Sequence, residues 1–167
     1  MTLNLRHAVR AIILDEDDRI LLCRFAFPHP AVPTEANVVW AAPGGGVEPG
    51  ETPLAALRRE LLEEIGLAVD ADPTHVWHQE LVAPGHAPGY DGMINDYFLI
   101  RTTSFQPRGT MSDDELAAEN ISGLHWWSPR DIAEYRGTDL FSPRDLTTPL
   151  TTLITDGAPS APVQLGL

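Results

Sequence analysis

The sequence predicts a mixed α/β domain built in layers, and three observations lead to this prediction. First, segments rich in β-branched and aromatic residues lie on both sides of a helix pattern near residues 52–66. Second, that helix pattern follows a glycine-rich turn, and its leucines form one apolar stripe. Third, two further helix starts lie after the last strand pattern. Strands that flank a central helix and precede a helical pair indicate packed layers of helix and sheet.

The length and composition suit one folded domain. The chain has 167 residues, of which 43% are apolar, enough to bury a sizeable core. We therefore expect a single domain over residues 1–167, with an irregular tail over 156–167. No apolar run reaches membrane-spanning length, and the first residues lack the pattern of a signal peptide. A lone cysteine, Cys23, excludes an intrachain disulfide and suits a reducing compartment, so we expect a cytoplasmic protein.

The charge balance is strongly acidic. With 11 basic and 24 acidic residues, the formal net charge is −13. Such a surface repels nucleic acids and anionic membranes, so we expect neither as a partner. A small substrate that carries phosphates would also be repelled unless cations intervened, which points to a metal. The plain alternative is that the acidic surface serves solubility alone.

The first half of the chain predicts three strands before the helix. They are His7–Leu14, Ile20–Phe25 and Val38–Ala42. The acidic turn at 15–18 joins the first two strands, so we expect them to form a hairpin. Residues 26–37 contain three prolines and no apolar period, which predicts a loop beside the glycine turn.

The central helix carries both a start signal and an end signal. Thr52 is the expected N-cap, and Pro53 suits the first turn because no hydrogen bond is lost there. Gly66 suits the left-handed residue that ends many helices. The helix can therefore bury its leucine stripe in a core and hold its polar side chains beside that core.

The second half predicts more strands and the helical pair. The strands are Thr74–Val82, Met93–Thr103 and Leu124–Trp127. Residues 106–120 are polar and acidic, which predicts a loop with one helical turn. A short helix is expected from Ser128 to about Tyr135. An amphipathic helix is expected within Arg144–Ile154, where Pro149 interrupts or delays it.

Three acids of the central helix share one side. At 100° per residue, Glu60, Glu63 and Glu64 fall within about a third of the helix circumference. A solvated acidic face is the plain explanation, because glutamate forms helices well. However, Glu60 and Glu64 are like charges four residues apart, and both lie towards the C-terminal end, where the helix dipole disfavours anions. A bound divalent cation would offset this repulsion, and oxygen ligands suit Mg²⁺ or Mn²⁺.

The spacing around these acids is more specific than the acids alone. The pattern begins with Gly45 and continues, after five residues, with Glu51. Seven residues later it continues with Arg59-Glu60-Leu61, and it ends with Glu63-Glu64 and Gly66-Leu67. The segment Gly45–Leu67 resembles the Nudix box at every fixed position, over 23 of the 167 residues. The resemblance implies a Nudix-type α/β/α sandwich with a mixed central sheet. It also implies hydrolysis of a nucleoside diphosphate linked to another moiety, with Mg²⁺ or Mn²⁺ as cofactor.

The resemblance implies a role for each residue that matches the box. Glu60 and Glu64 match the two main metal ligands, and Glu63 matches a further ligand or the group that activates water. A backbone carbonyl of the glycine turn, that of Gly44, is expected to join the metal shell.

Two further box residues match a brace. Arg59 and Glu51 are expected to hold the helix against the loop, so that their loss damages catalysis through orientation.

One more acid outside the box is expected in this family, as a ligand or a base. Four candidates precede the Trp126-Trp127 strand: Asp113, Asp114, Glu115 and Glu119. We favour Glu119 and then Glu115, with Glu80 as a weaker candidate.

The substrate residues are less clearly marked. Arg24 lies on a strand that often borders the nucleotide site, so a phosphate contact is expected there, and Gly45 belongs to the adjoining turn. Trp40 is the favoured residue for stacking on a base, ahead of Tyr97 and Phe98, although buried aromatics more often serve the core.

Two alternatives to the hydrolase remain. A non-catalytic Nudix-fold module that binds nucleotides or regulates is typically marked by eroded box acids, whereas every box acid is present here. An isomerase of isopentenyl diphosphate uses a catalytic cysteine, and Cys23 in an apolar strand is a poor match. Members of the resembled family are often dimers, so a homodimer is the oligomer that the resemblance implies.

The histidines predict no metal site. His75 and His78 stand three residues apart in an expected strand, so they should point to opposite faces.

Overall fold

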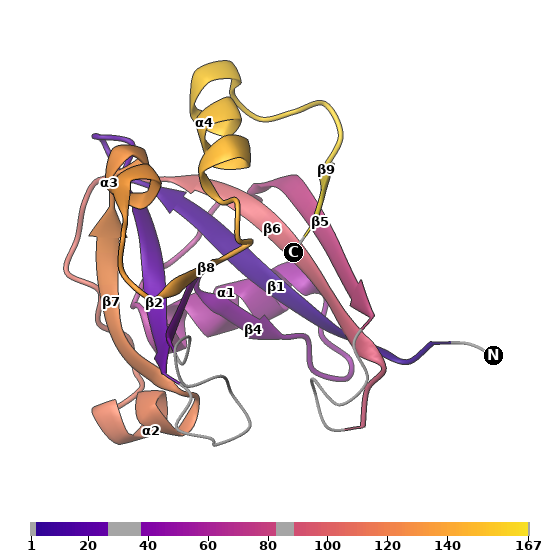
Figure 1. The fold of residues 1–167 in the computed structure, drawn as a ribbon. Coiled ribbons are helices and arrows are strands. Elements are labelled where there is room, and N and C mark those ends of the chain that lie inside the picture. Colours follow the sequence, from indigo (N-terminus) through magenta and orange to yellow (C-terminus); the bar gives the residue numbers. More distant parts are fainter. Residues whose placement is uncertain (1–2, 27–37, 83–88, 167) are drawn as a thin grey trace.

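The structure is a computed structural model, and it describes residues 3–26, 38–82 and 89–166. These described residues form nine strands and four helices, with four strands before the first helix (Figure 1). In order, the described elements are β1 (Leu5–Leu14), β2 (Ile20–Ala26), β3 (Val38–Ala41), β4 (Gly44–Gly46), α1 (Pro53–Glu64), β5 (Thr74–Val82), β6 (Gly92–Arg101), α2 (Asp113–Ala118), β7 (Ile121–Trp127), α3 (Pro129–Glu134), β8 (Leu140–Ser142), α4 (Thr147–Asp156) and β9 (Val163–Leu165).

The described strands form one mixed sheet. Its main order is β8-β3-β2-β1-β6-β5-β9, while β4 pairs with β1 and β7 pairs with β2. The parallel pairs are β1 with β6, β3 with β8, and β5 with β9. The remaining pairs are antiparallel. The prediction of a mixed central sheet is therefore confirmed.

The prediction that the first two strands form a hairpin holds only next to the turn and is wrong for the rest of the two strands. β1 and β2 share one Cα pair, Leu14 with Ile20. From there the two strands diverge, and β1 pairs in parallel with β6 along its whole length, from Leu5 opposite Gly92 to Leu14 opposite Arg101. The local turn signal is real, but the longer register with β6 supplies far more backbone hydrogen bonds.

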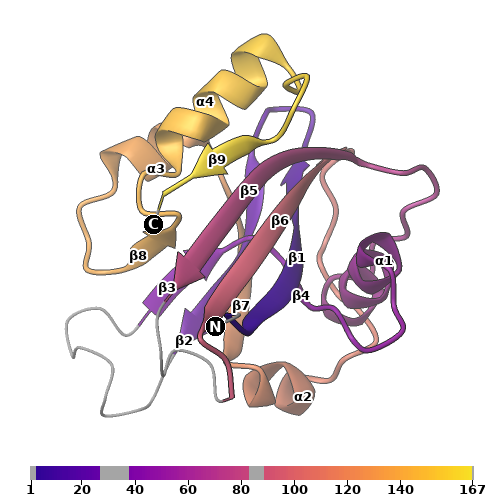
Figure 2. The same ribbon diagram turned by 90° about the vertical axis from the view of Figure 1, so that its right-hand side faces the viewer.

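The sheet is covered on both faces, which gives the expected sandwich. β1 alternates in burial between two cores, with Val9 and Ile13 in one and Ile12 and Leu14 in the other. The first core is closed by α1 and the second by α3 and α4. Figure 2 shows α1 on one side of the sheet and the α3–α4 pair on the other.

The helix signals of the sequence are confirmed in α1. The Thr52 hydroxyl accepts a hydrogen bond from the backbone N–H of Ala55 at 3.1 Å, which satisfies one of the free N–H groups of the first turn. Gly66 follows the helix with φ 74°, a conformation that suits glycine. A Cβ at Gly66 would also lie 2.2 Å from the carbonyl oxygen of Arg108, so the chain passes closely there.

Two later segments differ from the expectation. Pro149 lies in the first turn of α4, where proline is tolerated, so it neither interrupts nor delays the helix. The segment 156–167 was expected to be an irregular tail, and it contains the short strand β9, which pairs in parallel with β5. None of the helices in the described parts of the chain is long and apolar enough to cross a membrane.

Candidate active site

The acids of α1 differ sharply in burial. Glu60 and Glu64 are 6% and 1% exposed, although both carry a carboxylate. The third acid, Glu63, has a side chain that is 33% exposed. The two buried acids lie one turn apart on the edge of α1 that packs against β4, and Glu64 Oε1 accepts the backbone N–H of Gly44 at 3.0 Å.

The glycine turn lets the backbone approach these carboxylates. A Cβ at Gly45 would lie 2.6 Å from the carboxylate of Glu60. At Gly44, φ is 145°, and a Cβ would lie 2.0 Å from the carbonyl oxygen of Val9 on β1. Any larger residue would therefore push β4 away from either the helix or the sheet.

Arg59 links the helix to the turn. Its Nε and Nη2 donate to the two carboxylate oxygens of Glu51, at 2.8 Å and 3.0 Å. Nη2 also donates to the carbonyl oxygen of Gly46 at 3.1 Å, and Nη1 donates to Glu60 Oε1 at 2.9 Å. These bonds from Arg59 lower the pKa of Glu51 to about 2. The expected pairing of Arg59 with Glu51 is present.

Glu119 joins the two buried acids from outside the box. It is the C-cap residue of α2, just before β7. One carboxylate oxygen from each of Glu60, Glu64 and Glu119 lies within 4.8 Å of the others. The structure therefore brings the favoured outside acid to the box acids, and we call these three residues the glutamate cluster.

The other acids considered for this role lie in different surroundings. Asp113 pairs with Arg108, and Glu115 accepts the backbone N–H of Ser112 in a capping box at the start of α2. Glu80 pairs with His78 on β5.

The glutamate cluster is electrostatically strained. Burial raises the pKa of Glu64 to about 8, and burial also raises the pKa values of Glu60 and Glu119. Glu60 Oε2 is buried and has no hydrogen-bond partner in the described residues. A buried oxygen without a partner and a set of like charges fit a hard divalent cation, which would neutralise the charge and accept the free lone pairs.

The expected substrate residues do not gather in one place. The Arg24 side chain donates to Ser122 Oγ at 2.8 Å, between β2 and β7. Trp40 is buried, and its Nε1 donates to Asp139 at 2.9 Å. Its ring packs edge to face on Trp127, so its faces belong to the core.

The two other aromatic candidates are also packed inside. Tyr97 is 1% exposed in the core under α3 and α4, and Phe98 stacks on His75 on the opposite face.

The sequence missed two arginines beside the acids. A Cβ at Gly46 would lie 2.7 Å from Arg6 Nη2, so this guanidinium lies against the glycine turn. Arg6 and Arg10 partly oppose the rise in pKa that burial causes at Glu119 and Glu64 respectively. The sequence shows that Arg6 and Arg10 lie on or next to the first expected strand, but it does not show that this strand pairs with β4.

The prediction that His75 and His78 point to opposite faces is wrong. The register of β5 with β6 shifts between His75 and Trp77, which is a β-bulge. The extra residue turns both histidines to the α1 face, where each reaches Asp96.

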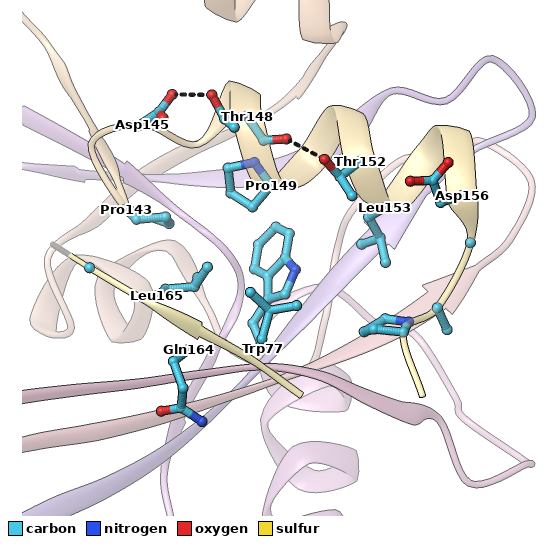
Figure 3. A pocket seen from close by; sticks show the side chains of 15 residues that line it. Trp77, Pro143, Asp145, Thr148, Pro149, Thr152, Leu153, Asp156, Gln164 and Leu165 are labelled. Atoms are coloured by element: carbon cyan, nitrogen blue, oxygen red, sulfur yellow. Dashed lines mark hydrogen bonds between the residues drawn. The ribbon is translucent and has the colours of Figure 1, made fainter. Parts of the chain in front are cut away.

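A separate apolar cavity of about 620 Å³ lies on the α4 face of the sheet. Figure 3 shows Trp77, Leu153 and Leu165 around it, with Thr148 on α4 and Asp145 just before that helix. Thr148 donates a hydrogen bond to Asp145 at 2.9 Å. None of the acids of α1 lines this cavity, so it is distinct from the glutamate cluster.

Comparisons with known proteins agree with the fold. A family model described as the NUDIX domain matches residues 4–146. The nucleoside triphosphatase NudI of Escherichia fergusonii is 30% identical over 125 residues, which cover 74% of this chain and 82% of that protein.

Solved structures show the same fold. The E. coli ORF135 protein has a TM-score of 0.61 at 22% identity, and the match covers 95% of this chain and 96% of that protein. The MutT protein from Methanosarcina mazei Go1 has a TM-score of 0.62 at 16% identity, with coverage of 93% and 97%. With the family match over residues 4–146 and the complete box, the chain belongs to the Nudix family of hydrolases.

Proposed function

We propose that this protein is a Mg²⁺- or Mn²⁺-dependent hydrolase that cleaves a pyrophosphate linkage in a nucleoside triphosphate, by attack of water at phosphorus. A nucleoside triphosphate is a nucleoside diphosphate linked to a further phosphate. The glutamate cluster carries the proposal, because three carboxylates gather at one point and one buried oxygen has no hydrogen-bond partner among the described residues. The choice of a triphosphate rests on the relative named a nucleoside triphosphatase, at 30% identity.

The residues that would hold the ion are Glu60, Glu64 and Glu119, with Gly44 beside them. When bound, the ion supplies charge neutralisation at the phosphate oxygens and a lower pKa for its water ligand. Gly44 contributes through its backbone, since its N–H already fixes one oxygen of Glu64.

The proton of the attacking water goes to Glu63 in this proposal. Glu63 is the most exposed of the three helix acids, and Arg59 Nη1 lies 3.4 Å from its Oε2. A carboxylate held in this way accepts a proton at its free oxygen while the leaving phosphate departs on the opposite side of phosphorus. Arg59 acts by orientation, because one guanidinium contacts Glu51, Glu60 and Glu63 together.

Arginine side chains on the neighbouring strands would bind the phosphate groups that the metal ion does not contact. Arg6 on β1 lies against the glycine turn, and Arg24 on β2 is the candidate that the sequence indicates. A guanidinium presents several N–H donors in one plane, which suits phosphate oxygens.

The test is a substrate panel with the purified chain and either Mg²⁺ or Mn²⁺. It contains ribonucleoside and deoxyribonucleoside triphosphates, nucleotide sugars, dinucleoside polyphosphates, ADP-ribose and coenzyme A, and products are separated by chromatography. We expect turnover of triphosphates, loss of turnover with a chelator, and a drop of at least about 100-fold in Glu64→Gln. Glu134→Gln is the matched control, since that exposed acid pairs with Arg130 on α3.

The outcomes separate the parts of the proposal. Turnover of only a nucleotide sugar or ADP-ribose would overturn the substrate class and keep the reaction. No turnover of any compound with either metal would contradict the proposed function and favour the non-catalytic binding module.

A further inference from the structure

Three histidines converge on one carboxylate on the α1 face of the sheet. His7 Nε2 lies 2.7 Å from Asp96 Oδ2. His75 Nε2 and His78 Nδ1 lie 2.9 Å and 2.6 Å from Asp96 Oδ1. These residues come from β1, β5 and β6, and none belongs to the glutamate cluster. We call them the histidine cluster.

The backbone register fixes this convergence. His78 stands directly opposite Asp96 in the antiparallel pair of β5 and β6. In the parallel pair of β1 and β6, Asp96 stands opposite Val9, so His7 lies two positions away on the same face. The bulge in β5 adds His75 to that face. Side chains on three paired strands are held more precisely than side chains on loops.

We propose that His75, His78 and Asp96 form a second metal site, for a divalent transition-metal ion of the Zn²⁺ kind. One ligand atom from each residue lies within 4.8 Å of the others. Ligand atoms around a tetrahedral Zn²⁺ stand about 3.3 Å apart, given bond lengths of about 2.0–2.1 Å. The present separations of 2.6 Å and 2.9 Å from Asp96 Oδ1 need only a small opening of the side chains.

The surroundings of the three ligands support a metal site. A histidine that binds a metal usually donates its other ring N–H to a carboxylate or carbonyl, which fixes the tautomer. His78 Nε2 lies 3.0 Å from Glu80 Oε1, which leaves Nδ1 directed at the site. His7 donates to the second oxygen of Asp96, and Phe98 stacks on His75 with ring centroids 5.0 Å apart. Each ligand is thus oriented by another side chain.

The competing arrangement is a hydrogen-bonded cluster without metal. Each ring nitrogen of His78 lies beside a carboxylate oxygen, and these hydrogen bonds to Glu80 and Asp96 raise the pKa of His78. Burial opposes ionisation of Asp96, but hydrogen bonds from His78 and His7 lower its pKa overall. His75 Nε2 also lies 3.0 Å from the carbonyl oxygen of Trp77.

Metal entry therefore exchanges protons for an ion. For an ion to bind, His78 Nδ1 and His75 Nε2 must each offer a lone pair, so a proton on either nitrogen goes to solvent or to the other nitrogen of the same ring. No electrons are transferred. This exchange favours an ion that bonds well to imidazole nitrogen, which Zn²⁺ and Co²⁺ do and Mg²⁺ does not. The side chains are partly exposed, at 35% for His75 and 21% for His78, so an ion can enter from solvent.

The test is a Zn²⁺ titration of the chelator-treated full chain in excess Mg²⁺, read by competition with a chromogenic chelator. We expect one Zn²⁺ per chain at this site, with affinity reduced more than about 100-fold in His78→Ala and in Asp96→Asn. Glu80→Gln removes only an orienting group, so we expect a loss of about 10- to 100-fold. His125→Ala is the matched control, because His125 lies on β7 among Trp40 and Trp127 and outside the cluster.

Two further measurements distinguish loss of this site from misfolding of a variant and from binding of the ion at another site. Co²⁺ should give a visible absorption band with the wild-type chain and with Glu64→Gln, whose glutamate cluster is altered. Zn²⁺ should raise the melting temperature of the wild-type chain and of His125→Ala, but not of His78→Ala.

The proposal is overturned by either of two results. If the wild-type chain binds no Zn²⁺ under these conditions, the histidines serve only as hydrogen-bond donors to Asp96. If His75→Ala and His78→Ala bind Zn²⁺ as the wild-type chain does, or if Glu64→Gln loses it, the ion binds elsewhere.

Discussion

The glutamate cluster and the histidine cluster are opposites in charge. The first gathers three carboxylates from α1 and the end of α2, and burial raises the pKa of each. The second gathers histidines around one carboxylate on neighbouring strands, where the pKa of Asp96 falls and that of His78 rises. Three carboxyl groups are thus held together in one place, whereas in the other the histidines form hydrogen bonds to a single carboxylate.

This difference indicates how a bound cation would change the interactions within each cluster. At the glutamate cluster a cation would relieve repulsion and accept a lone pair of Glu60 Oε2, which has no hydrogen-bond partner within the described parts of the chain. At the histidine cluster a cation must replace hydrogen bonds that already exist. An arrangement that costs stability without its ligand is the stronger indication of function. The same reasoning predicts opposite responses when one carboxylate is removed from each cluster.

The largest expected effect concerns turnover. Glu60→Gln should lower kcat by about 10²- to 10³-fold, because an amide replaces the carboxylate that we propose as a metal ligand beside the glycine turn. Asp96→Asn should lower kcat by no more than about threefold, since Asp96 lies outside the glutamate cluster. Steady-state kinetics at saturating Mg²⁺ checks both. Equal losses in the two variants would mean that the clusters act as one unit.

The next effect concerns stability without metal. Asp96→Asn should lower the free energy of unfolding by about 2–3 kcal/mol, because charge-assisted hydrogen bonds from two histidines are lost. Urea unfolding with a chelator present measures this. The matched control is Asp72→Asn, an exposed partner of Arg58 whose loss should cost less than about 0.5 kcal/mol. A loss at Asp96 no larger than the control's would show that the histidine cluster contributes little stability.

Weakening the contact of Arg59 with the turn is expected to lower kcat less than replacing a proposed metal ligand does. Arg59→Lys should lower kcat by about 10- to 100-fold, because lysine cannot donate two parallel bonds to Glu51 while contacting Glu60. Arg58→Lys, at the next position and paired with Asp72, is the control. Kinetics and a melting curve together separate lost orientation from lost folding. Wild-type kcat in Arg59→Lys would refute the brace.

The smallest effect is a pH dependence with a definite sign. Burial raises the pKa of Glu64 from 4.5 to about 8, so the stability linked to this shift is complete below pH 4.5 and is lost as pH rises to about 8. Glu64→Gln does not titrate, and it should become more stable than the wild-type chain by at least about 1 kcal/mol near pH 8.5. Urea unfolding with a chelator at pH 5, 7 and 8.5 measures the difference. A difference that does not change with pH would contradict the raised pKa.

Local signals in the sequence predicted local structure well. The caps and the proline of α1 are short-range features, and both the helix and its buried leucines follow from them. The approach of Glu119 was expected from its place before β7, and the structure brings it to Glu60 and Glu64.

Long-range register was not predictable. The parallel pairing of β1 with β6 joins residues about 87 positions apart, and no turn signal encodes it. The bulge in β5 carries no proline or glycine, so an alternating pattern assigned His75 and His78 to opposite faces. Trp40 shows the same limit, because its buried indole N–H donates to Asp139, which lies far along the chain.

The short strand β9 has a consequence for how the molecule behaves in solution. An uncovered sheet edge is a template on which a second chain can add, and short edge strands discourage this. β9 covers Trp77, His78 and Gln79 of β5, and Gln79 donates a hydrogen bond to the carbonyl oxygen of Gly166 at 2.6 Å. β9 therefore leaves an edge of only three residues on this side of the sheet, and we expect an affinity tag to disturb the fold less at the N-terminal end, away from this contact.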